Sequence, residues 1–143
     1  MSEVYIVGFD GSPQGQRAVD YAAERAKRAQ GGVHLVFVLE WSPYSFHTPE
    51  ELAERHMRRE QELERARALV TPIVEKLKKA GVNADSEVRH GNAAELLCEI
   101  AKEKGAAEII IGRTGDSAFT QRLLGGLVLT LAQVSPVPLT IVP

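Results

Sequence analysis

The chain of 143 residues, with 44% hydrophobic and 25% charged residues, is long enough for one domain with a substantial core and has the composition of an ordinary globular protein. Its formal net charge of −2 provides no basic field, which argues against a nucleic-acid partner. No apolar run approaches the roughly 20 residues of a membrane-spanning helix, so no membrane partner is expected either.

The beginning of the chain predicts two strands joined by a helix. Residues 4–7 are rich in β-formers and predict a short strand. Ser12 is a good N-cap and Pro13 a good first helical residue, so a helix should begin there. Its buried stripe consists mainly of alanines, which would let the helix lie close to a sheet. Residues 33–39 predict a second, longer strand.

A long, highly charged helix is predicted from residue 50 to residue 80. A regular apolar stripe begins only at Leu63, so we expect the part before it to be solvated or loosely held. Pro72 falls inside the stripe, where its ring removes a backbone hydrogen bond and costs about 3 kcal/mol. We therefore expect a kink or a break one turn before this proline.

The rest of the chain predicts three further strands with helices between them. Residues 84–89 form a weak strand, and Asn92 caps the helix that follows. Residues 108–111 form a buried strand, the last helix begins near the glycine pair 125–126, and residues 138–142 form the last strand. The alternation of strands and helices predicts an α/β fold with a largely parallel sheet, in one domain covering residues 1–143.

Glycines gather after the strand 108–111 and at the predicted start of the last helix. Gly112 and Gly115 would let the backbone approach a ligand without interference from Cβ. Gly125 and Gly126 would present free N–H groups at a helix N-terminus, where the helix dipole favours an anion. Short glycine patterns are weak signals, and a plain strand-end turn and helix start explain this one equally well.

The spacing G-x2-G-x9-G after the fourth strand resembles the ATP-binding signature of the universal stress protein family. The same resemblance is carried by residues 7–12, 91–95, 105–112 and 138–142, so it covers essentially the whole chain. It implies an open, Rossmann-like sheet of five parallel strands in the order 3-2-1-4-5, with helices on both faces.

In this strand order the chain reverses direction between strands 1 and 4, and open α/β sheets bind ligands at such a switch point. The resemblance implies that Gly8 and Asp10 meet the ribose and adenine, and that Val38 packs against the base. The residues that it implies for the ribose and phosphates follow the fourth strand. They are Ile111, Gly112, Gly115, Gly125, Gly126 and Leu127.

One residue of this set departs from the family's motif, and two others have a second interpretation. The family's motif usually ends in Gly-Ser or Gly-Thr, whereas Gly126 lacks the hydroxyl, which should lower the affinity for ATP roughly ten- to a hundredfold. Arg113, like Arg122, could neutralise phosphate charge or simply be solvated. Asp10 could instead be a turn-forming or capping carboxylate before Ser12.

The expected function is a regulatory module that binds ATP, alone or with Mg²⁺, and is not an enzyme. No lysine follows the glycines as in a Walker motif, so ATP hydrolysis should be slow at most. We predict no catalytic residue and no metal site, because the four histidines lack metal-ligand spacing.

The alternative is a nucleotide-independent stress-response scaffold that acts through protein contacts. The family pairs its last strands across a two-fold axis, and residues 139–142 form a short edge strand that could make such a homodimer. The single cysteine, Cys98, and an N-terminus without a cleavable signal favour a cytoplasmic location.

Overall fold

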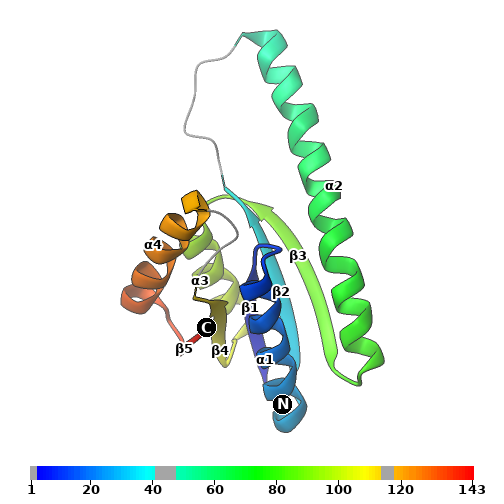
Figure 1. Cartoon of the computed structure of the whole chain (residues 1–143), viewed down its shortest axis with the longest axis vertical. Helices are drawn as coiled ribbons and strands as arrows, with labels where there is room; N and C mark the ends of the chain where they lie inside the picture. Colours follow the sequence, from blue (N-terminus) through cyan, green and yellow to red (C-terminus); the bar gives the residue numbers. More distant parts are fainter. Residues whose placement is uncertain (1–2, 41–47, 114–117) are drawn as a thin grey trace.

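The computed structural model describes residues 3–40, 48–113 and 118–143, and for residues 118–125 it describes the backbone alone. Strands and helices alternate along the chain (Figure 1). They are β1 (Val4–Phe9), α1 (Pro13–Ala29), β2 (Gly32–Leu39), α2 (Pro49–Lys79), β3 (Asn83–His90), α3 (Ala93–Lys104), β4 (Glu108–Gly112), α4 (Ala118–Val134) and β5 (Leu139–Val142). The strands form one parallel five-stranded sheet in the order β3-β2-β1-β4-β5, which confirms the predicted architecture.

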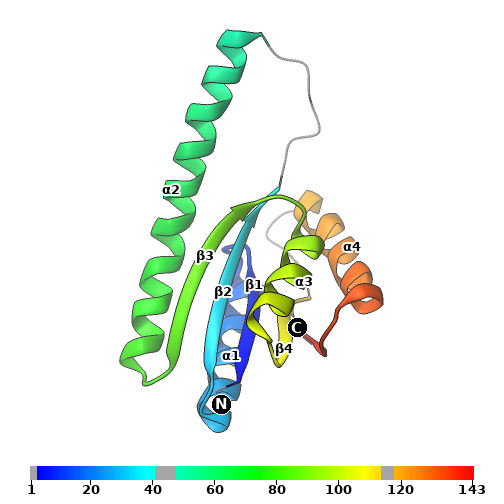
Figure 2. The same ribbon diagram turned by 180° about the vertical axis from the view of Figure 1, so that it is seen from behind.

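Helices cover both faces of the sheet and bury two separate cores. Helices α1 and α2 lie on one face, where the alanine stripe of α1 packs with Val70, Val74 and Leu77 of α2 (Figure 1). Helices α3 and α4 lie on the other face, which is seen in Figure 2, and there Leu97 and Leu131 pack on the strands. Successive residues of β1 alternate between the two cores, as the period of a strand requires.

Helix α2 is longer and less buried than its neighbours. Its side chains become buried only from Ala66 onwards, and Leu52 and Met57 are 54% and 62% exposed, which confirms the predicted solvated part. This part projects beyond the sheet in Figure 1. Of the kink or break predicted before Pro72, the break is wrong, because α2 is one continuous helix. Pro72 is exposed, and buried residues on both sides of it hold the helix against the sheet.

Helix α4 begins earlier than the glycine pair. It starts at Ala118, so the prediction of a start near residues 125–126 is wrong. Residues 118–124 contain neither glycine nor proline, and a glycine inside a helix costs only about 1 kcal/mol, which helix packing readily offsets. Gly125 and Gly126 therefore lie in the interior of α4, where backbone N–H groups normally bond to the carbonyl four residues earlier.

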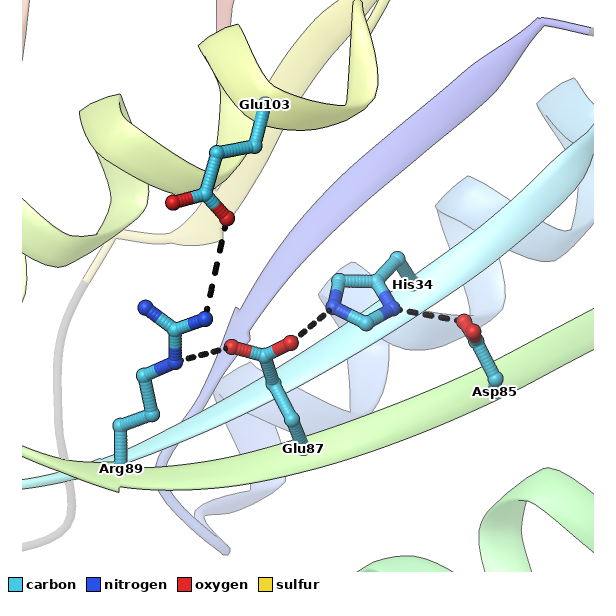
Figure 3. Close-up of polar contacts among 5 residues, drawn as sticks. All are labelled: His34, Asp85, Glu87, Arg89 and Glu103. Carbon is cyan, nitrogen blue, oxygen red and sulfur yellow. Dashed lines mark hydrogen bonds and ion pairs between the residues drawn. The ribbon is translucent and has the colours of Figure 1, made fainter.

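A chain of charged side chains crosses the α3 side of the sheet at its β3 edge (Figure 3). His34 on β2 is 3% exposed, with Nδ1 2.6 Å from Asp85 Oδ1 and Nε2 3.0 Å from Glu87 Oε2. Arg89 lies with Nε 2.6 Å from Glu87 Oε1 and Nη2 3.7 Å from Glu103 Oε2 on α3. The network links β2, β3 and α3 where the side chains of β3 are too polar to form a core.

A second buried polar network, centred on Glu108, connects β4 and β5 with α1. Glu108, 7% exposed, stands at the start of β4. Its carboxylate accepts hydrogen bonds from Arg25 Nη2 on α1 at 2.9 Å and from Thr140 Oγ1 on β5 at 2.8 Å. This carboxylate therefore joins α1, β4 and the edge strand β5.

Candidate functional site

The candidate site lies at the carboxyl ends of β1 and β4, which pair directly, with Gly8 opposite Ile111. From these ends the chain runs to α1 on one face of the sheet and towards α4 on the other, so this is the switch point of the fold. Asp10 follows β1, and Gly112 ends β4. The structure thus brings the two predicted arms of the site to neighbouring strand ends.

Within the described part of the chain, Asp10 uses only one of its two carboxylate oxygens. Oδ1 accepts hydrogen bonds from the backbone N–H and the hydroxyl of Ser12, at 2.9 and 2.5 Å. Oδ2 is buried and has no hydrogen-bond partner among the described residues. A buried, unpaired carboxylate oxygen is costly, and an N–H or O–H donor of a ligand would relieve that cost.

Gly8 and Gly112 are required by packing around the site. A Cβ at Gly8 would lie 3.1 Å from Ile111 Cγ2 and 3.2 Å from Leu97 Cδ1. A Cβ at Gly112 would lie 3.0 Å from the backbone carbon and oxygen of Gln14 in the first turn of α1. Gly112 therefore lets the end of β4 approach the backbone of α1 directly, which brings the two arms of the site together.

Three predicted residues contribute to the core on the α3 and α4 side. Ile111 is 2% exposed and belongs to that core, so only its backbone is available to a ligand. Val38 and Leu127 are partly buried and pack against the same core. Arg113 is exposed, and its backbone N–H donates to the carbonyl of Val142 at 2.8 Å.

The structure describes the remaining predicted residues only in part. Gly115 lies outside the described residues, as does the side chain of Arg122. Gly126 is exposed, and a Cβ there would have no neighbour within 4 Å. The two glycines of α4 do not form a helix N-terminus, so an anion cradle made by their free N–H groups is not present in this structure.

Ser12 and Gly15 belong to the site, although the sequence suggested a capping role for Ser12 and no role for Gly15. Ser12 is 1% exposed, and its hydroxyl oxygen accepts a hydrogen bond from Gly15 N at 3.0 Å. A Cβ at Gly15 would lie 2.9 Å from Asp10 Oδ1. An aspartate two residues before a serine is a turn signal, and it could have pointed to the hydrogen bonds between Asp10 and Ser12.

Two titratable side chains outside the candidate site, Cys98 and His90, have shifted pKa values. Burial raises the pKa of the Cys98 thiol, which lies 3.9 Å from the carbonyl of Val134, so this cysteine is a weak nucleophile. Burial, and next the charge of Arg59, lower the pKa of His90 at the end of β3. The described residues bring together no group of three or more histidine, cysteine, aspartate or glutamate side chains suited to a metal ion.

Two further features bear on where a ligand or a membrane could act. A pocket of about 440 Å³ lies at the opposite, amino edge of the sheet, lined by Asn83, Asp85, Glu103 and Lys104 among others, away from the switch point.

Within the described part of the chain, no helix combines the length and the hydropathy that crossing a membrane requires.

Comparison with known proteins gives a consistent result. Residues 1–143 match the model of the universal stress protein family. The universal stress protein YxiE of Bacillus subtilis is 28% identical over 144 residues, which cover 96% of each chain. The structure of UspA from Lactobacillus plantarum superposes with a TM-score of 0.85 at 19% identity, covering 99% of this chain and 97% of that one. An Archaeoglobus fulgidus universal stress protein in complex with dAMP gives a TM-score of 0.67 at 16% identity, covering 100% and 98%.

The two glycines that differ most in their surroundings should respond oppositely to alanine. Gly112→Ala should lower the free energy of unfolding by about 1–3 kcal/mol, because the new methyl group meets the backbone at Gln14. Gly126→Ala should raise it by roughly 0.5–1 kcal/mol, because it enters open space within a helix. Urea denaturation measures both, and destabilisation of the same size in the two variants would contradict the packing at Gly112.

Proposed function

The chain belongs to the universal stress protein family, and we propose that it is a regulatory module that binds ATP at the carboxyl ends of β1 and β4. The observation that carries this proposal is the buried Oδ2 of Asp10 at the switch point of the sheet, which has no hydrogen-bond partner among residues 3–40, 48–113 and 118–143. A nucleoside offers the N–H and O–H donors that this oxygen lacks. The dAMP bound by a protein of the same fold is an adenine nucleotide of this kind.

The charges of Asp10 and Arg113 indicate which end of the nucleotide would lie on each side of the site. The carboxylate of Asp10 repels phosphates, so the nucleoside part belongs on this side, with the partly buried Val38 against the base. The phosphates belong on the side of β4, near the exposed Arg113. Gly8, Ile111, Gly112, Gly115, Gly125, Gly126 and Leu127 complete the proposed set.

The phosphate side would have to change when ATP binds. Gly125 and Gly126 can donate to phosphate oxygens only if the start of α4 opens, since in the helix interior these N–H groups are already used. Mg²⁺ bound to the phosphates would offset part of their negative charge on this side. We infer a regulatory role rather than turnover, because no lysine follows the glycines to stabilise phosphoryl transfer.

Titration calorimetry with ATP, with and without Mg²⁺, tests the proposal directly. The wild-type protein should bind, and Asp10→Ala should weaken binding by about tenfold or more, because a hydrogen bond to a charged group is lost. Asp20→Ala is the matched control, since Asp20 is exposed on α1 and away from the strand ends. The absence of binding to the wild type at millimolar ATP would rule the proposal out.

Position 126 separates the effect of a phosphate-binding hydroxyl from that of helix propensity. Alanine favours the helix, so Gly126→Ala should weaken ATP binding by resisting the opening of α4. Gly126→Ser adds a donor and should bind ATP about tenfold more tightly than Gly126→Ala. Calorimetry on the two variants measures this ratio. Equal affinities would show that the residue at 126 does not meet the phosphates.

A homodimer is the second proposal, and exposed apolar side chains favour it. Ile141 on the edge strand β5 is 40% exposed, and Leu129 and Val134 on the neighbouring α4 are 66% and 56% exposed. An unpaired edge strand beside such a surface is a template for a second copy of the chain. Such a dimer could also act as a scaffold without nucleotide.

Light scattering at micromolar concentration tests the dimer. The wild type should have twice the mass of the chain, and Ile141→Lys should shift it towards the monomer, because a charge then faces the partner's copy of the strand. Met57→Lys is the control, since Met57 is 62% exposed on the projecting part of α2. A monomeric wild type, or equal effects of the two substitutions, would contradict the interface.

A further inference from the structure

We infer that Ser12 is a positioning residue of this site, which holds Asp10 so that one carboxylate oxygen stays available for the nucleoside. The inference rests on the proposed function and adds a residue that acts through Asp10. Ser12 donates twice to the same oxygen, Oδ1, from its backbone N–H at 2.9 Å and its hydroxyl at 2.5 Å. The other oxygen, Oδ2, is left buried and without a partner in the described part of the chain.

The hydroxyl of Ser12 has no freedom to serve another partner. A carboxylate oxygen only accepts, so the single hydroxyl proton must point at Asp10. The hydroxyl oxygen then accepts from Gly15 N at 3.0 Å, which also caps α1. Because Ser12 is 1% exposed, water does not compete for these contacts. The first turn of α1 and the carboxylate of Asp10 are therefore fixed by the same side chain.

Gly15 lies against the carboxylate of Asp10 and leaves the space that this carboxylate occupies. An added Cβ would lie 2.9 Å from Asp10 Oδ1 and 3.0 Å from Phe9 Cδ1, both closer than ordinary contacts. The carboxylate can occupy its position only because residue 15 has no side chain. With Ser12 on one side and Gly15 on the other, Asp10 is ordered when the protein folds and not when the ligand arrives.

This arrangement selects the kind of ligand group that can meet Asp10. The unused oxygen is a buried acceptor, so it takes an amino or hydroxyl donor and repels a phosphate. If Ser12 lost its hydroxyl, Asp10 could turn and satisfy itself elsewhere, and the ligand would then have to reorder it.

A double-mutant cycle tests the role of Ser12 through Asp10. ATP binding is measured by calorimetry for the wild type, Ser12→Ala, Asp10→Ala and the double variant. Ser12→Ala alone should weaken binding about tenfold, because the charged acceptor of Asp10 is then no longer held in place for the ligand. In the Asp10→Ala background the same change should alter affinity by less than about twofold, since the two residues act as one unit.

Asn92→Ala is the matched control for the loss of a helix cap. The Asn92 side chain accepts from Glu95 N at 3.1 Å at the start of α3, so the variant loses the same type of hydrogen bond without touching Asp10. Its affinity for ATP should stay within about twofold of the wild type, because Asn92 is not among the residues of the proposed site. Full affinity of Ser12→Ala, or an equal loss in both backgrounds, would overturn the inference.

A crystal structure of Ser12→Ala gives a test that needs no nucleotide. The carboxylate of Asp10 should leave its position beside Gly15 when the hydroxyl is removed. If it stays in place, Ser12 does not position it, whatever the affinity for ATP. A wild type that binds no nucleotide would defeat the proposed function, whereas this structural result would still decide the role of Ser12.

Discussion

The pairing of β1 with β4 is the contact on which the site depends. β1 lies at the centre of the sheet, and its two neighbours, β2 and β4, continue into helices on opposite faces. Two glycines permit this junction to be tight: Gly8 leaves room for Ile111 and Leu97, and Gly112 leaves room for the backbone at Gln14. A side chain at Gly112 would push the first turn of α1 away from the end of β4, and one at Gly8 would press against Ile111 and Leu97 in the core on the α3 side. Asp10 and the phosphate-side residues would then no longer share one edge of the sheet.

The fold could be predicted well because its signals are local and repeated. Apolar runs separated by charged, helix-forming segments fix the alternation of strands and helices, and the family motifs supply the strand order. The two errors have the same origin, because each treated a single residue as decisive. Pro72 costs α2 about 3 kcal/mol and each glycine costs α4 about 1 kcal/mol, and packing along the rest of each helix outweighs that cost.

The site was harder to predict because its geometry depends on contacts that a pattern does not contain. The sequence offered two interpretations of Asp10, a turn carboxylate and a ligand-binding carboxylate. In the structure Oδ1 accepts the hydrogen bonds of the turn from Ser12, and Oδ2 has no partner among the described residues. That division is visible only when both oxygens are placed. The role of Gly15 is likewise hidden in sequence, because it rests on the 2.9 Å between an absent Cβ and Asp10 Oδ1.

The two arms of the proposed site differ in how ready they are for a ligand. On the nucleoside side, Ser12 and Gly15 already hold Asp10 in place, so little ordering remains to be done. On the phosphate side, Gly125 and Gly126 lie in the interior of the α4 sequence. Any nucleotide that uses their N–H groups must first open the helix. The apparent affinity then falls by the fraction of molecules in which the helix is open. In the proposed site, Asp10 would therefore govern which group is accepted, whereas the stability of the start of α4 would govern how tightly the nucleotide binds. If the proposed site binds ATP in this way, anything that stabilises or loosens α4 would change the nucleotide occupancy, and a second copy bound at the adjoining β5 edge would be one such influence.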